Sequence, residues 1–209
     1  GVGGGAGLHL VGSNSTLARV VIAGNVGAGS QFVGGGLYAT QQQLTLSQST
    51  VSGNVARTGG GIYINGTGNY SLSHVELLDN TAAEGGGLAI IEDAAVTFDH
   101  GRIVANTAAT AGGGMYLSTS ATTGLSHLSV VGNEATNGGA VVIVNSSSSS
   151  NTLFFESSDF SGNTASVSAP GLLNNQGSYD PGISSCNAFE NSFPFTGTVV
   201  NFEGFQADP

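Results

Sequence analysis

A glycine triplet and an asparagine recur together along most of this chain, and their spacing constrains the fold more than any other feature of the sequence. The triplet or a close variant begins at Gly5, Gly34, Gly59, Gly85, Gly112 and Gly138, with a degenerate copy at Ala169. An asparagine stands five to nine residues before each copy from Gly34 onward, at Asn25, Asn54, Asn80, Asn106, Asn133 and Asn163. Six repeats of 25 to 31 residues indicate a solenoid of stacked coils.

Apolar residues occupy fixed positions before each repeat asparagine. The residues that lie three positions before the asparagine are Ile22, Val51, Leu77, Ile103, Val130 and Phe160. The residues that lie eight positions before it are Leu17, Leu46, Leu72, Phe98, Leu125 and Phe155. Each has a companion two residues earlier, which is the period of a β-strand, and a third alternating pair follows the glycines. Three short strands per repeat predict an all-β, right-handed, single-stranded parallel β-helix, a three-sided solenoid with about 26–27 residues per coil.

The repeat pattern predicts β-helix coils over residues 1–169 and a different structure over residues 170–209. All four prolines and five phenylalanines follow the last repeat, at Pro170, Pro181, Pro194, Pro209, Phe189, Phe193, Phe195, Phe202 and Phe205. The end of a solenoid exposes its core and its unpaired strand edges. We therefore interpret residues 170–209 as a degenerate last coil with an aromatic C-terminal cap, and a junction to a further domain is the alternative. Because the chain starts at the edge of a repeat, we expect it to be a mature or excised piece of a longer protein.

The six repeat asparagines are predicted to be structural. Each stands where the chain turns after the third strand, and amides at equivalent positions of stacked coils can hydrogen-bond to one another as a ladder. The glycines supply the backbone freedom that the adjoining corner needs. They are not expected to bind phosphate, because Gly85-Gly86-Gly87 leads into a strand and not into a helix N-terminus.

The two parts of the repeat resemble a known family. Gly85-Gly86-Gly87-Leu88 and Phe160-Ser161-Gly162-Asn163 are similar to the repeat of the chlamydial polymorphic outer-membrane proteins, and the resemblance covers about residues 5–173. Those proteins are autotransporter adhesins with a β-helical passenger, and related repeats occur in other large surface proteins of bacteria and algae. The resemblance implies a β-helix with an adhesive or structural role at a cell surface.

Charge and hydropathy limit the possible partners. The net charge is −10, and the only basic residues besides histidine are Arg19, Arg57 and Arg102. Such a chain offers no surface for a phosphate backbone, so we expect no nucleic-acid partner. No apolar run approaches the roughly 20 residues that a membrane-spanning helix needs, so we expect no membrane span in this segment.

Four Asn-X-Ser/Thr sequons predict N-glycosylation at Asn14, Asn65, Asn69 and Asn145. All four fall after the strand that follows the glycines, which predicts one exposed edge of the rod and an extracellular or cell-surface location. The alternative is chance, because the chain is rich in asparagine and serine.

Two columns of side chains are candidates for binding. His74, His100 and His127 stand six positions before consecutive asparagines, so we expect them to stack on adjacent coils about 4.8 Å apart. They are candidates for a shared Zn²⁺ or for a pH-sensitive strip, and the alternative is an exposed polar column at a bend.

The second column consists of His9, Tyr38, Tyr63 and Tyr116, which alternate with the inward residues of the strand after the glycines. The alternation predicts an outward-facing interaction stripe. Packing against another protein, stacking on sugar rings and a self-stabilising ladder of tyrosines remain the three interpretations.

Polysaccharide lyases and glycosidases occur on this fold, so a catalytic role is an alternative. Glu92 and Asp93 are adjacent in a predicted loop, and neighbouring residues of a strand point to opposite sides, unlike the paired carboxylates that glycosidases hold on one face. Asp99-His100-Gly101-Arg102 is similar to fragments of pectinase active sites but lacks the accompanying Arg-Ile-Lys-type element. Arg102 is expected to form a cross-strand ion pair with Glu76, since both lie four positions before an asparagine.

These observations predict a non-catalytic extracellular β-helix, a structural or adhesive segment of a larger surface or fibre protein, with no catalytic residues and no cofactor. Its expected partners are other copies of itself or neighbouring surface proteins, and carbohydrate is a further candidate. The alternative is a carbohydrate-binding or carbohydrate-active β-helix of the lyase or hydrolase type.

Overall fold

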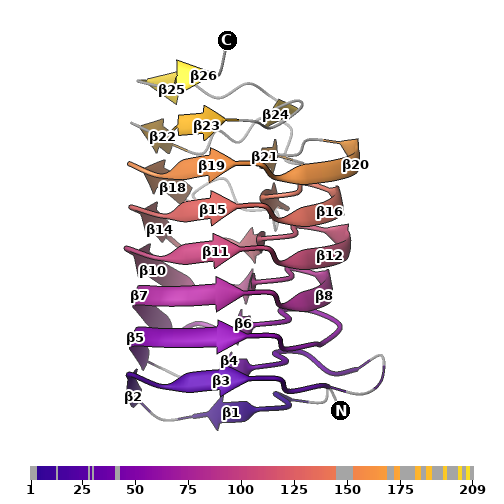
Figure 1. Cartoon of the computed structure of the whole chain (residues 1–209). Coiled ribbons are helices and arrows are strands. Elements are labelled where there is room, and N and C mark those ends of the chain that lie inside the picture. The colour runs from indigo at the N-terminus through magenta and orange to yellow at the C-terminus, as the bar shows by residue number, and fades with distance from the viewer. Residues whose placement is uncertain are drawn as a thin grey trace.

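The chain folds as a parallel β-helix, as predicted. The computed structural model describes residues 4–12, 14–27, 29, 31–40, 43–144 and 153–168, together with six short strands between residues 172 and 207. Within this part of the chain each strand pairs in parallel with the equivalent strands of the coils before and after it, and no helix is present (Figure 1). The strands belong to three sheets that run along the rod.

The first sheet is built from the strands that follow the glycines. They are β1 (Leu8–Val11), β4 (Leu37–Thr40), β6 (Ile62–Asn65), β9 (Leu88–Glu92), β13 (Met115–Thr119), β17 (Val141–Ile143), β21 (Leu172–Asn174) and β24 (Phe195–Thr196). The register pairs equivalent repeat positions, Leu37 with Ile62 and Ile62 with Leu88. The pattern that predicted these strands therefore also predicts their register.

The second sheet has two stacks of strands with a bend between them. The stack before the bend contains β2 (Ser15–Ala18), β10 (Ala95–Asp99), β14 (Thr123–Ser126), β18 (Leu153–Glu156), β22 (Gly182–Ser184) and β25 (Phe202–Glu203). The stack after it contains β3 (Val21–Ala23), β11 (Arg102–Val104), β15 (Ser129–Val131), β19 (Asp159–Ser161), β23 (Asn187–Phe189) and β26 (Gln206–Ala207). The long strands β5 (Gln43–Ser52) and β7 (Asn69–Leu78) run through the bend and join the two stacks.

The third sheet was not expected from the sequence. Its strands are β8 (Thr81–Glu84), β12 (Thr107–Ala111), β16 (Glu134–Asn137) and β20 (Thr164–Ser168). They occupy the segment between the asparagine and the glycines, for which the repeat pattern predicted a turn. Each places one alanine inward (Ala82, Ala108 and Ala135 are buried), so these strands carry too little apolar alternation to be recognised.

The interior is filled by the residues that the repeat offsets predict. Leu46, Leu72, Phe98, Leu125 and Phe155 are completely buried in one column, and equivalent columns run along the other inward positions. These side chains form one continuous hydrophobic cluster through the coils. Removing this apolar surface from water is the main favourable contribution to folding.

The repeat asparagines hydrogen-bond to one another from coil to coil, and those from Asn54 to Asn163 are buried beside this core. The Oδ1 atom of Asn80 accepts hydrogen bonds from the backbone N–H and the side-chain amide of Asn54, both at 3.0 Å. The Nδ2 atom of Asn80 donates to the carbonyl of Val51 at 2.9 Å and to Oδ1 of Asn106 at 3.0 Å. Amide-to-amide bonds of this kind join all six asparagines from Asn25 to Asn163.

The glycine triplet and the asparagine depend on each other sterically. The first glycine of the triplet has a positive φ, for example +63° at Gly59, where a side chain would strain the backbone. A Cβ at the third glycine, Gly61, would lie 3.0 Å from Nδ2 of Asn80. Among the described copies from Gly34 onward, alanine replaces this third glycine at Ala140. The close approach of backbone and amide explains why the two motifs recur together.

The last strands continue the stacks of the preceding coils. β21 pairs with β17, β22 with β18 and β23 with β19, and β24, β25 and β26 add one further strand to each of these stacks. The aromatic cap that the sequence predicts for residues 170–209 depends on side chains outside the described part of the chain, so it stays a prediction.

Replacement of Asn106 by alanine (Asn106→Ala) is expected to lower the free energy of unfolding by about 2–5 kcal/mol. The change leaves the N–H of Asn80 and the carbonyl of Leu77 without the hydrogen bonds that Asn106 makes to them, and each unsatisfied buried group costs about 1–3 kcal/mol. Urea denaturation followed by circular dichroism measures the difference.

The matched control is Asn25→Ala, at the half-exposed first step of the ladder, where water replaces the lost partners. We expect it to cost about 1 kcal/mol or less. An equal loss of stability in both variants would contradict a special role for the buried amides.

Candidate functional site

The bend in the second sheet places one outward column of residues in an unusual backbone conformation. Its members stand six positions before each asparagine and have φ angles between +47° and +55°; they are Arg19, Gln48, His74, His100, His127 and Ser157. Residues other than glycine seldom adopt this left-handed conformation, although histidine does so more readily than most. The bend therefore turns three histidines on consecutive coils out of the sheet.

The three histidine rings stack on one another. The ring centroids of His74 and His100 are 5.1 Å apart with an interplanar angle of 8°, and those of His100 and His127 are 4.5 Å apart at 16°. All three residues are exposed. This is the spacing that the repeat register predicts, but stacking alone does not make the ring nitrogens converge.

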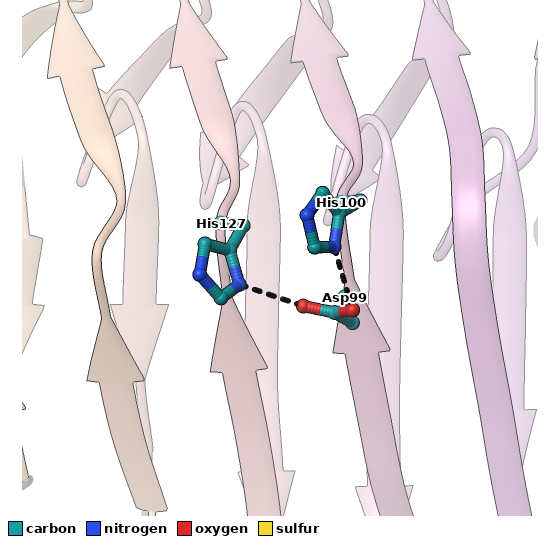
Figure 2. A group of neighbouring side chains, drawn as sticks. All are labelled: Asp99, His100 and His127. Atoms are coloured by element: carbon teal, nitrogen blue, oxygen red, sulfur yellow. Dashed lines mark hydrogen bonds and ion pairs between the residues drawn. The ribbon is translucent and has the colours of Figure 1, made fainter.

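Asp99, the last residue of β10, makes two of the rings converge. Its Oδ2 lies 2.6 Å from Nδ1 of His100, and its Oδ1 lies 2.8 Å from Nδ1 of His127 on the next coil (Figure 2). The hydroxyl of Ser126, which pairs with Asp99 in the sheet, donates to the same Oδ1 at 2.8 Å. Asp99, His100 and His127 each offer a ligand atom within 4.8 Å of the others, whereas the repeat offsets predicted a group of His74, His100 and His127.

The electrostatics of Asp99 follow from these contacts. Partial burial favours the neutral acid and acts to raise its pKa, but the hydrogen bonds from His100, His127 and Ser126 outweigh that effect. The pKa of the Asp99 carboxyl therefore lies well below its usual range. A carboxylate that accepts from both Nδ1 atoms fixes the orientation of both rings and leaves Nε2 facing solvent.

An open groove of about 340 Å³ borders the histidine column, and its lining includes Gln48, His74 and His100. The predicted ion pair lies in this groove, with Nη1 of Arg102 at 2.9 Å from Oε1 of Glu76. Because solvent reaches both side chains, the pair contributes little to stability.

Three of the four predicted glycosylation sites lie in the described part of the chain, at the corner between the first and second sheets. Asn14 precedes β2, Asn65 ends β6 and Asn69 begins β7. Asn14 and Asn69 are exposed, whereas Asn65 is half-buried and its Oδ1 is enclosed. Asn145 lies outside the described residues. Asn14 and Asn69 are thus the accessible sequons of this corner.

The predicted interaction stripe is less exposed than the alternation suggested. His9 packs edge-on against Tyr38, and Tyr38 stacks on Tyr63 with ring centroids 5.5 Å apart. Tyr63 is only 9 % exposed, and Tyr38 and Tyr116 are half-buried. These rings, with Val33, form a second hydrophobic cluster outside the main core.

The chain segment at the corner before the glycines covers Tyr63. The left-handed first glycine turns the chain so that this corner lies over the outer face of the first sheet, where a Cβ at Gly59 would be 2.8 Å from Cβ of Tyr63. The expectation of a solvent-exposed aromatic stripe was therefore wrong for Tyr63 and only partly right for Tyr38 and Tyr116.

Comparisons with protein-family models, with curated proteins and with solved structures return no match. In the part of the chain that the structure describes, no helix has the length and apolar character needed to cross a bilayer. The function of the chain is therefore inferred from its own residues.

Burial raises the pKa of Tyr63, with a further contribution from the charge of Tyr38. The folded state favours the neutral form of Tyr63, and this preference stabilises the folded chain. The stabilisation is complete below the pKa of Tyr63 in the unfolded chain, about 10, and is lost as the pH rises through its pKa in the folded chain. Tyr63→Phe removes this ionisation. Its melting temperature should fall less than that of the unmodified chain between pH 9 and about 11.5.

Thermal denaturation at a series of pH values, each compared with the same chain at pH 8, measures the effect. Identical losses in the two chains above pH 10 would show that Tyr63 ionises as freely in the folded state as in the unfolded state.

Proposed function

We propose that this chain is a non-catalytic structural or adhesive rod, a segment of a larger extracellular surface or fibre protein. The unbroken asparagine ladder from Asn25 to Asn163 is the observation that carries the proposal. Each coil makes the same buried contacts to the next, so the rod can be lengthened or shortened by whole coils without a change in local structure. Such interchangeability suits a spacer or a stalk.

Several surface features support an extracellular role. Asn14 and Asn69 are exposed sequons on one corner, and the net charge of −10 favours solubility over association with polyanions. Val11, Val21 and Val26 are large apolar side chains exposed on the first coil. Contact with another copy or with a neighbouring surface protein would remove them from water.

Carbohydrate binding is the second candidate, and a specific groove favours it. This groove has a volume of about 310 Å³ and lies on the stack that contains β10, with Gln43, Asn69, Ser71, Thr97 and Thr122 in its lining. Amides and hydroxyls supply both donors and acceptors for sugar hydroxyls. The burial of Tyr63 argues against the alternative in which sugars stack on the tyrosine row.

Deletion of one coil tests the spacer proposal. Removing residues 80–105 joins Asp79 to Asn106 and deletes the 26 residues between equivalent positions of the ladder. We expect the shortened chain to fold with an unchanged β-sheet spectrum and to be about 4.8 Å shorter by small-angle X-ray scattering. A shortened chain that does not fold would contradict the interchangeability of the coils.

The same pair of chains tests the carbohydrate alternative, because the deletion removes Thr97 and Ala95 from the groove. Both chains are assayed with a panel of neutral and acidic polysaccharides for new reducing ends, for unsaturated uronate products and for binding by calorimetry. We expect neither cleavage nor binding. Cleavage or saturable binding by the intact chain that disappears in the shortened chain would favour the alternative.

A further inference from the structure

Asp99, His100 and His127 present two imidazole nitrogens and a carboxylate toward one point on the surface of the rod (Figure 2). This donor set is distinct from the features that support the spacer function, since all three side chains lie outside the core and the ladder. Imidazole nitrogen with carboxylate oxygen is the ligand chemistry of zinc, copper and nickel, whereas calcium and magnesium prefer oxygen ligands alone.

We propose that Asp99, His100 and His127 bind a single divalent transition-metal ion of the Zn²⁺ or Cu²⁺ type. In the metal-free arrangement the 2.6 and 2.8 Å contacts are hydrogen bonds, each with a proton between carboxylate oxygen and Nδ1. A metal ion about 2.0–2.2 Å from each ligand atom separates tetrahedral neighbours by roughly 3.3 Å. A rearrangement that brings the three ligand atoms, which lie within 4.8 Å of one another, to this separation lets one ion replace both hydrogen bonds, and each neutral imidazole then carries its proton on Nε2.

The backbone holds the two histidines in place for this exchange. The N–H of His100 donates to the carbonyl of Ser126 at 3.1 Å, and the N–H of His127 donates to that of Glu156 at 3.0 Å. The hydroxyl of Ser126 also orients the carboxylate of Asp99, as outer hydrogen-bond partners do in metal sites. The side chains of Asp99, His100 and His127 are 44 %, 50 % and 49 % exposed, which leaves the remaining coordination positions to water.

His74 has the same bend conformation but belongs outside the site. His74 stacks on His100 from the coil before it, whereas His127 stacks on His100 from the coil after it. The sheet pairs Asp99 with Ser73, so the coil of His74 supplies a hydroxyl where the coil of His100 supplies a carboxylate. His74 is therefore a matched control for a metal site, with the same residue type, the same φ region and similar exposure.

Isothermal titration calorimetry of the 209-residue chain with Zn²⁺ at neutral pH, in a buffer that does not coordinate metals, tests the proposal. We expect one ion per chain. His127→Asn and Asp99→Asn should each weaken binding by about tenfold or more, while His74→Asn should leave it unchanged. Asparagine is the replacement for histidine because it tolerates the left-handed backbone conformation.

Absence of saturable binding would overturn the proposal, as would an equal weakening by His74→Asn, which would indicate diffuse binding along the histidine column. Electron paramagnetic resonance of the unmodified chain with one equivalent of Cu²⁺ provides a readout that does not depend on the folding of any variant. Two coordinated nitrogens support the site. One nitrogen, or three with His74 included, would refute it.

Discussion

The interaction on which the rest of the structure depends is the hydrogen bond between asparagine amides on adjacent coils. A fully buried amide such as that of Asn106 has two donors and an acceptor that water cannot reach. They are satisfied by the amides of the asparagines on both adjacent coils, by the backbone N–H of Asn80 and by the carbonyl of Leu77. The steps between asparagines vary from 26 to 30 residues, yet every step is bonded. In the first step Asn25 and Gly34 are nine residues apart instead of the five or six residues of the later copies, and the ladder is still bonded.

This constraint divides the chain into an interior that is tied to the repeat and a surface that is free to vary. The third glycine must stay small where it packs closely, since a Cβ at Gly61 would lie 2.6 Å from the carbonyl oxygen of Gly87 and 3.0 Å from Nδ2 of Asn80. Outward positions carry no such requirement, and the bend of the second sheet turns one of them out of the sheet on every coil. Asp99, His100 and His127 can therefore form a cluster on one part of the rod without a cost to its core.

Much of the fold can be predicted from the sequence because the residues of each coil recur periodically. The features that could not be predicted depend on three-dimensional geometry, which the period does not describe. Inward residues such as Leu46 and Phe98, and the register between coils, follow from the offsets to the asparagines. The strand Thr81–Glu84 cannot be predicted from these offsets, because Ala82 is its only inward side chain. The cover over Tyr63 depends on the direction of the glycine corner. The hydrogen bond between Asp99 and His127 depends on side-chain directions at a left-handed bend, which the sequence does not contain. The adjacent residues Asp99 and His100, with His127 at the equivalent position of the next coil, were the features of the sequence that could have indicated this cluster.

Native-state hydrogen exchange tests the central claim most directly, because the ladder predicts which amides open only when the whole rod unfolds. The backbone N–H groups of Asn54, Asn80 and Asn106, each bonded to the side-chain oxygen of the next asparagine, should exchange as slowly as the N–H groups of the strands beside them. Exchange of these three amides at the rate of exposed corner residues, with the strands still protected, would show that the asparagine ladder does not hold the coils together.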